Sequence, residues 1–265
     1  MRIQFYPKNK LIKFLLKNLI YPAIIVIIAF FVLFECSFIG TKKVYDKNNL
    51  ALYIDKQENV PTDTILSIID KYEHLIQSKE VTLKHKIYIV FCKSRKEYDT
   101  KTLFLSRNSL ATNRFTVPQI IFAPVDFDKG VVIAIDSTFT NRPISSILAH
   151  EITHSYELQT LGFIKFIVCK NWKAEGFAEY VSQSSTLDIK TATDLFVDNK
   201  EYNDSVNVSP KKYKNIFNYF KSRLRADYLL RHKQISIDEF WNTKYNEQML
   251  DDEIRKAIID NKYQL

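Results

Sequence analysis

Two histidines four residues apart, His150 and His154, enclose Glu151 in an H-E-x-x-H motif that limits the folds open to this chain. The motif lies in an apolar helical pattern, with Pro143 in the first turn and Gly162 beyond the end. On a helix, two such histidines project from one face, so that both imidazoles can converge on one metal ion. Glu151 is placed beside them to take a proton from a metal-bound water. The motif therefore predicts a metal-binding helix.

A second helical pattern follows the motif and carries Glu175 and Glu179 one turn apart on one face. Trp172, Phe177 and Val181 supply apolar residues for packing. A catalytic zinc site usually has three protein ligands and one open position, so that a third ligand must come from outside the H-E-x-x-H motif. Glu175 is the candidate for this third ligand.

The two segments together resemble the gluzincin metallopeptidases, in particular aminopeptidase N-like and peptidase MA-like catalytic domains. The second helix of these proteins carries an Asn-Glu-Gly-Phe-Ala-type motif, and residues 172–180 here read Trp-Lys-Ala-Glu-Gly-Phe-Ala-Glu-Tyr, with Ala174 in place of Asn. A metzincin would need Gly and His at the positions of Glu157 and Thr160. The resemblance covers about a tenth of the chain, but its motifs are specific.

The resemblance implies a zinc peptidase with Zn²⁺ as its cofactor. The implied ligands are His150, His154 and Glu175. Glu179 falls where thermolysin-like enzymes place a carboxylate that hydrogen-bonds a zinc histidine. Gly176 would allow two helices to approach closely.

In the mechanism that the resemblance implies, Glu151 is the general base toward a metal-activated water that attacks a peptide carbonyl. A long helical pattern that begins at Ser209 and Pro210 resembles the gluzincin helix that carries a transition-state tyrosine. Tyr219 is the candidate donor to the oxyanion, and Tyr228 is expected to pack. Weaker candidates for the donor are Arg223, Arg225 and His232. The exopeptidase motif Gly-x-Met-Glu-Asn is absent, which favours an endopeptidase.

The N-terminal part of the chain is a basic segment followed by an uncharged one. Residues 1–17 carry five basic residues and no acidic one, and residues 18–34 carry no charge. We expect residues 18–40 to form one transmembrane anchor. The positive-inside rule then places residues 1–17 in the cytoplasm and the catalytic domain outside it. Cleavage as a signal peptide is disfavoured by the residues from Glu35 to Gly40.

Residues 41–265 are expected to form one zincin-like (gluzincin) α+β domain with a small sheet, the metal-binding helix pair and a helical C-terminal half. An amphipathic helix is predicted over residues 61–76 and a buried strand over 86–92. A strand over residues 130–135 precedes the metal helix. The resemblance implies that this strand is an edge strand that binds extended peptide.

The expected partners are a peptide or protein substrate and the membrane. The net charge of +8 is explained by a solvated lysine-rich surface, and no nucleic-acid motif stands out. Cys92 and Cys169 could pair, but two buried free thiols are at least as compatible with their apolar surroundings. The rival hypothesis is a membrane-tethered binding or assembly module that keeps the fold without turnover.

Overall fold

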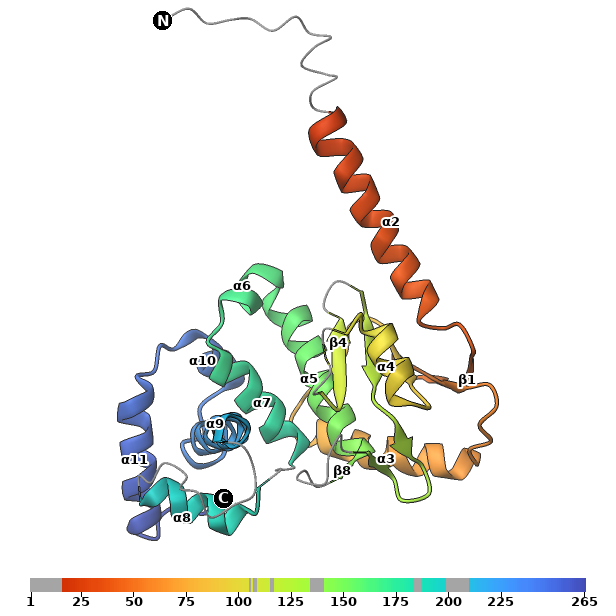
Figure 1. The fold of residues 1–265 in the computed structure, drawn as a ribbon. Helices are drawn as coiled ribbons and strands as arrows, with labels where there is room; N and C mark the ends of the chain where they lie inside the picture. Colours follow the sequence, from red (N-terminus) through yellow and green to blue (C-terminus); the bar gives the residue numbers. More distant parts are fainter. Residues whose placement is uncertain are drawn as a thin grey trace, which may run out of the picture.

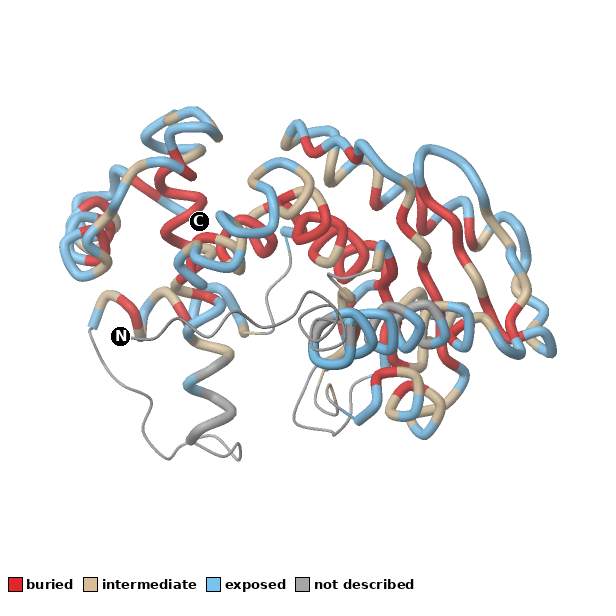
Figure 2. Tube along the Cα trace, turned by 90° about the horizontal axis from the view of Figure 1, so that it is seen from above, coloured by how far each residue is buried: buried red, intermediate tan, exposed pale blue. Residues whose placement is uncertain are grey.

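The computed structural model describes residues 16–104, 106, 109–114, 117–133, 141–183, 187–198 and 210–265. Within these residues the chain is an α+β protein, as the sequence predicts. A β-sheet half and a helical half lie on the two sides of the helix that carries the histidine motif, α5 (Ile144–Leu161; Figure 1). Buried residues run through the middle strands and through α5 (Figure 2). The metal-motif helix is therefore part of the core.

The larger sheet has five strands in the order β1-β2-β3-β5-β4. Their bounds are β1 Thr41–Lys47, β2 Leu50–Asp55, β3 Ile87–Phe91, β4 Ala111–Arg114 and β5 Gln119–Phe122. Strands β2, β3 and β5 run parallel, whereas β1 and β4 are antiparallel to their neighbours. Ile89 and Val90 point to opposite faces of β3 and are both fully buried, which confirms the predicted buried strand.

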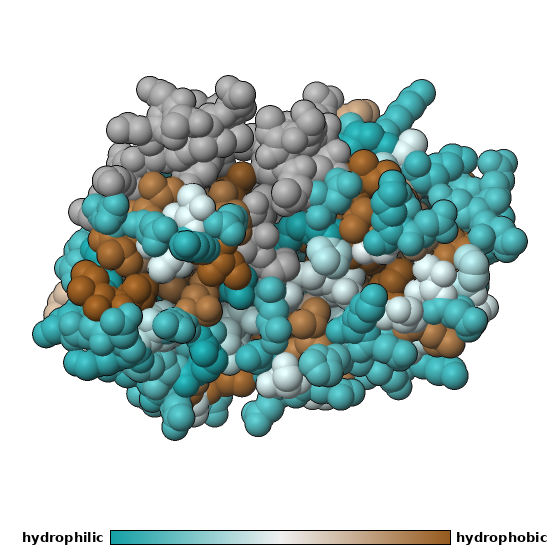
Figure 3. Space-filling view, turned by 90° about the horizontal axis from the view of Figure 1, so that it is seen from below, coloured by the Kyte–Doolittle hydropathy of each residue, from teal (hydrophilic) through white to brown (hydrophobic). Residues whose placement is uncertain are grey.

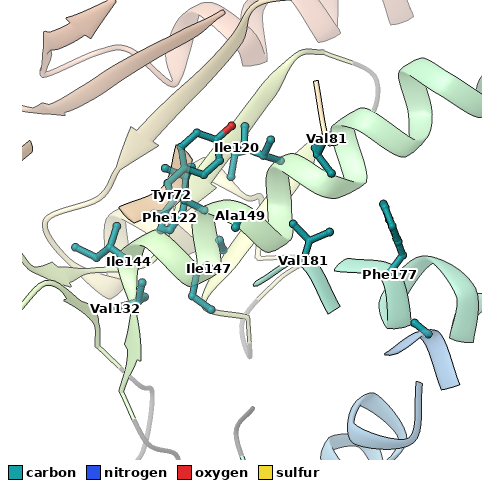
Figure 4. Packing of buried hydrophobic residues seen from close by; sticks show 14 of the residues in the cluster. Tyr72, Val81, Ile120, Phe122, Val132, Ile144, Ile147, Ala149, Phe177 and Val181 are labelled. Atoms are coloured by element: carbon teal, nitrogen blue, oxygen red, sulfur yellow. The ribbon is translucent and has the colours of Figure 1, made fainter. Parts of the chain in front are cut away.

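Helices α3 (Thr62–Gln77) and α5 pack together beside this sheet. The apolar face of α3 is buried as predicted from its periodicity, and it includes Ile65, Ile69 and Tyr72. In Figure 4, Tyr72 lies with Ile120 of β5 and Ala149 of α5 in one cluster. Burial of each large apolar side chain contributes about 1.5–3 kcal/mol, so that the cluster fixes α5 against the sheet. Helix α4 (Arg95–Lys101) packs near β5.

A small second sheet has the order β6-β7-β8, with β6 Val125–Asp126, β7 Val131–Val132 and β8 Arg142–Pro143. Strand β7 pairs with β6 on one side and with β8 on the other. The prediction that this segment is a peptide-binding edge strand is therefore wrong for Val131 and Val132, and residues 134–135 lie outside the described residues. In the larger sheet, among the described strands, β4 is an edge and lies against α5.

The predicted transmembrane anchor over residues 18–40 is wrong. Among the described residues, no helix combines the length and the apolar character needed to cross a bilayer. Helix α2 (Tyr21–Cys36) has 16 residues, or about 24 Å at 1.5 Å per residue, against roughly 30 Å of hydrocarbon. A short π-helical turn, η1 (Leu16–Ile20), precedes α2, and turns at residues 37–40 lead into β1. The predicted single-pass location, with a cytoplasmic N-terminus and an extracytoplasmic domain, is wrong for the same reason.

The C-terminal end of α2 packs on the larger sheet through aromatic rings. Phe34 lies 5.4 Å from Tyr88 between ring centroids, and Phe38 lies 4.6 Å from Tyr53. Lys101 of α4 also donates a hydrogen bond to the carbonyl of Ser37. Contacts therefore cross the predicted boundary between residues 40 and 41.

The helical half follows α5 in the sequence. Its elements are α6 Phe163–Val168, α7 Asn171–Ser182, α8 Ile189–Val197, α9 Pro210–Asp227, the π-helical η2 Tyr228–His232, α10 Ile237–Asn242 and α11 Glu247–Ile259. Helices α7 and α9 meet at Gly176, where an added Cβ would lie 2.3 Å from the carbonyl oxygen of Ser222. The close approach predicted for Gly176 is thus confirmed. Arg225 holds α9 to α11 through two hydrogen bonds of 2.7 and 2.8 Å to Asp251.

The cysteines form no disulfide in the described part of the chain. The face in Figure 3 is mostly hydrophilic, and its apolar residues lie in several separate areas. All three cysteines, Cys36, Cys92 and Cys169, are free thiols. Burial raises the pKa of Cys92 to about 12, which makes its thiol unreactive. Of the two alternatives from the sequence, free thiols are correct.

Candidate metal site

Helix α5 carries both histidines in its buried part, which extends from Ile144 to Glu157. The helix begins after Pro143 and ends before Gly162, whose φ is 75°, in agreement with the predicted ends. Asn113 of the edge strand β4 donates hydrogen bonds to the carbonyl of Glu151 (2.8 Å) and to Ser155 Oγ (2.7 Å). These contacts fix the rotation of α5 relative to the sheet. They direct His150 and His154 toward α7, which packs on the other side of α5.

Three side-chain atoms converge between α5 and α7. His150 Nε2 and His154 Nε2 lie 3.2 Å apart. Glu175 Oε2 lies 3.6 Å from His150 Nε2 and 3.7 Å from His154 Nε2. The ligand atoms of the three residues are all within 4.8 Å of one another. The structure therefore brings together the three residues that the sequence predicts as metal ligands.

The chemistry of these three atoms fits a cation. His154 Nδ1 is hydrogen-bonded to Glu157, and His150 Nδ1 lies 3.2 Å from Glu179 Oε1 without a well-aligned hydrogen bond. We assign the ring protons to Nδ1 and an acceptor lone pair to each Nε2. Glu175 Oε2 is also an acceptor, and it is buried without a hydrogen bond among the described residues. Three acceptors that face one another repel unless a cation lies between them. Tetrahedral bonds of about 2.0–2.1 Å separate ligand atoms by about 3.4 Å, close to the observed distances.

Glu179 supports His150 from the next turn of α7. Its Oε1 lies 3.2 Å from His150 Nδ1. Arg142 of β8 forms two hydrogen bonds to the same carboxylate, of 3.3 and 3.4 Å. Burial alone would raise the pKa of Glu179, but Arg142 and His150 outweigh burial and lower it to about 2. Glu179 is thus a carboxylate in the position that the sequence predicts, beside a candidate ligand.

Glu157 supports His154 and is the residue that the sequence analysis missed. Its Oε2 lies 3.0 Å from His154 Nδ1, and its side chain is fully buried. Burial, only partly opposed by His154, raises the pKa of Glu157 to about 7. Burial would lower the pKa of His154, but Glu157 and Glu175 outweigh it and raise that pKa. The sequence did contain a signal for this contact: Glu157 follows His154 by three positions on one helix, and residues at that spacing share a face.

Glu151 has the surroundings of a proton acceptor. Burial raises its pKa, and Glu175 adds to this effect, while His150 and His154 oppose it. A carboxylate whose pKa moves toward neutrality is better matched to accepting and returning a proton near pH 7. The residue as a whole is neither fully buried nor exposed.

The structure also separates the candidates for the oxyanion donor. Tyr219 of α9 is 42% exposed, and its pKa is raised by burial and then by the carboxylates of the site, Glu175 foremost. Its hydroxyl therefore keeps its proton near this site. Tyr228 is buried and packs, as expected. Arg225 is held by Asp251, and His232 stacks on Tyr228. Tyr219 and Arg223 remain as candidates near the metal site.

Comparisons with known proteins place the chain in no family. No model of a known protein family matches it, and no curated protein matches its sequence.

Proposed function

We propose that this chain is a zinc-dependent peptidase of the gluzincin type that hydrolyses peptide bonds with Glu151 as general base. The observation that carries the proposal is the set of three buried acceptor atoms, His150 Nε2, His154 Nε2 and Glu175 Oε2, at 3.2–3.7 Å from one another. When bound, a zinc ion would supply Lewis-acid activation of water and of the peptide carbonyl. Zinc is favoured because two imidazoles and one carboxylate are a typical catalytic ligand set for this metal.

The residues of the chain then have separate tasks. Glu151 accepts a proton from the attacking water and later gives it to the leaving amine. Tyr219 donates its hydroxyl proton in a hydrogen bond to the oxygen on which negative charge develops. Strand β4 is the edge strand beside α5, so that an extended peptide can add to it through main-chain hydrogen bonds. This strand takes the place that the sequence analysis gave to residues 130–135.

The test measures zinc content and peptide hydrolysis separately. The purified full chain is expected to carry about one zinc per molecule by elemental analysis and to cleave unfolded protein substrates into peptides detected by mass spectrometry. Glu151→Gln keeps the size of the side chain but removes the base. We expect it to keep zinc and to reduce hydrolysis by at least ~10²-fold. Tyr219→Phe is expected to keep zinc with a smaller loss of turnover.

Two outcomes would contradict the proposal. Glu175→Ala with full zinc occupancy would exclude the proposed ligand set. A wild-type chain that binds zinc but cleaves no peptide, with Glu151→Gln behaving like wild type in every respect, would support the rival hypothesis of a binding module without turnover.

A further inference from the structure

Arg223 lies one helical turn after Tyr219 on α9, and its guanidinium has no bonded partner among the described residues. In the described part of the chain, no hydrogen bond or ion pair joins Arg223 to another residue, and its Nη1 atom is buried without a partner. A guanidinium has five N–H donors and is always charged. Leaving such donors unsatisfied in a buried place costs free energy, so the arrangement calls for an explanation.

The two neighbouring buried arginines show that partners are the rule in this part of the molecule. Arg225, two residues further along α9, binds Asp251 through two hydrogen bonds of 2.7 and 2.8 Å. Arg142 binds Glu179 through two hydrogen bonds of 3.3 and 3.4 Å. A structural role for Arg223 would be expected to give it a similar carboxylate.

Arg223 is nevertheless close to the metal site, because it follows Ser222, whose carbonyl oxygen meets Gly176 beside Glu175. Burial lowers the pKa of Arg223, while Glu179, followed by Asp227, acts in the opposite direction. Glu179 is already occupied by Arg142 and His150. Arg223 is thus near the carboxylate of Glu179 but forms no hydrogen bond or ion pair with it. Arg223 is only partly buried, and Tyr219 one turn before it is 42% exposed, so that a ligand can approach this part of α9.

We propose that Arg223 binds a carboxylate of the peptide substrate. A planar guanidinium matches a carboxylate through two parallel hydrogen bonds, which accounts for donors that the protein leaves free. The assignment rests on the proposed peptidase function for the identity of the ligand. Residues four apart on a helix are about 5–6 Å apart, and an extended peptide rises about 3.3 Å per residue. The carboxylate is therefore close to the bond that is cleaved, and it is either the C-terminal carboxylate or an acidic side chain.

Binding to the Glu151→Gln form of the full chain tests this assignment without requiring turnover. Zinc-loaded protein is titrated by calorimetry with pairs of unstructured hexapeptides. In the first pair, one peptide has a free C-terminal carboxylate and the other has an amidated C-terminus. In the second pair, one peptide has Glu at an internal position and the other has Gln there. For one of the two pairs we expect the carboxylate peptide to bind at least ~10-fold more tightly than its neutral partner. The pair that shows the preference identifies the source of the carboxylate.

Arg223→Met in the same background is expected to reduce the ratio of the two affinities, carboxylate peptide over neutral peptide, to near one. Arg223→Lys should retain part of this preference, because lysine keeps the charge but lacks the two parallel N–H donors of the guanidinium. Lys214→Met is the matched control, since it removes an exposed charge from the same helix and should leave the ratio unchanged. Because Arg223 has no partner to lose, Arg223→Met should not lower the urea midpoint. A ratio that is the same with and without Arg223 would overturn the assignment. Absence of hydrolysis by the wild-type chain would bear on the proposed function alone.

Discussion

Replacing Glu157 by Gln tests how the metal site is held. Glu157 Oε2 accepts the hydrogen bond from His154 Nδ1 at 3.0 Å, in a fully buried place. A hydrogen bond to a charged group contributes about 1.5–3 kcal/mol, and one between neutral groups about 0.5–1.5 kcal/mol. Gln can still accept the bond but lacks the charge that makes the imidazole a stronger ligand. The expected loss is about 1–1.5 kcal/mol, or roughly 5- to 13-fold weaker zinc binding.

The measurement is the zinc dissociation constant of the full chain in competition with a chelator of known affinity. Glu151→Gln is the matched control, because it makes the same substitution on the same helix. Glu151 faces the site, but no hydrogen bond joins its carboxylate to either histidine in the described structure. We expect its zinc affinity to stay within about threefold of wild type.

A second measurement distinguishes support of the metal ligand from a general structural role. Gln is neutral, costs less to bury than a carboxylate and can still accept the hydrogen bond from His154 Nδ1. Glu157→Gln should therefore leave the urea midpoint of the chelator-treated protein equal or higher. Equal zinc affinities of the Glu157→Gln and Glu151→Gln variants, or a lower midpoint with unchanged zinc affinity, would refute the reasoning.

Two further predictions concern packing and thiol chemistry. Gly176→Ala puts a Cβ 2.3 Å from the carbonyl oxygen of Ser222, so α7 and α9 must separate; urea denaturation should show a loss of about 1–3 kcal/mol, and an unchanged midpoint would contradict the close contact. Burial raises the pKa of Cys92 to about 12, so a thiol reagent at pH 8 should label the exposed Cys36 rapidly and Cys92 only after unfolding; equally rapid labelling of both would show that Cys92 is not buried in solution.

The ligand set could be predicted because its information is local. The spacing of His150 and His154 fixes their relative direction on a helix, and Gly176 beside Glu175 marks a helix contact. Helix α3 was predictable for the same reason, since its apolar period is complete within residues 61–76. In each of these segments, the residues that specify the structure lie within a few turns of one another.

The errors come from features that depend on distant residues. The transmembrane anchor was predicted from the apolar composition of residues 18–40. Composition does not show that the helix ends at Cys36 and that turns then lead into β1. The edge strand was misplaced because the partners of β7 come from β6 and β8, which the local pattern does not reveal. The local sequence does not distinguish Arg223 from Arg225, whose partners Asp251 and Glu247 come from the distant helix α11.

One turn of α7 has to meet three requirements at once, and this explains its composition. Glu175 reaches toward α5 to join the two histidines, and Glu179 reaches His150 from the same face one turn later. Gly176 lies between them and contacts α9 at Ser222. A larger residue at position 176 would move α9, and with it Tyr219, away from the carboxylates. We therefore expect substitutions at Gly176 to reduce turnover as well as stability, whereas Glu175 substitutions should act on metal binding first.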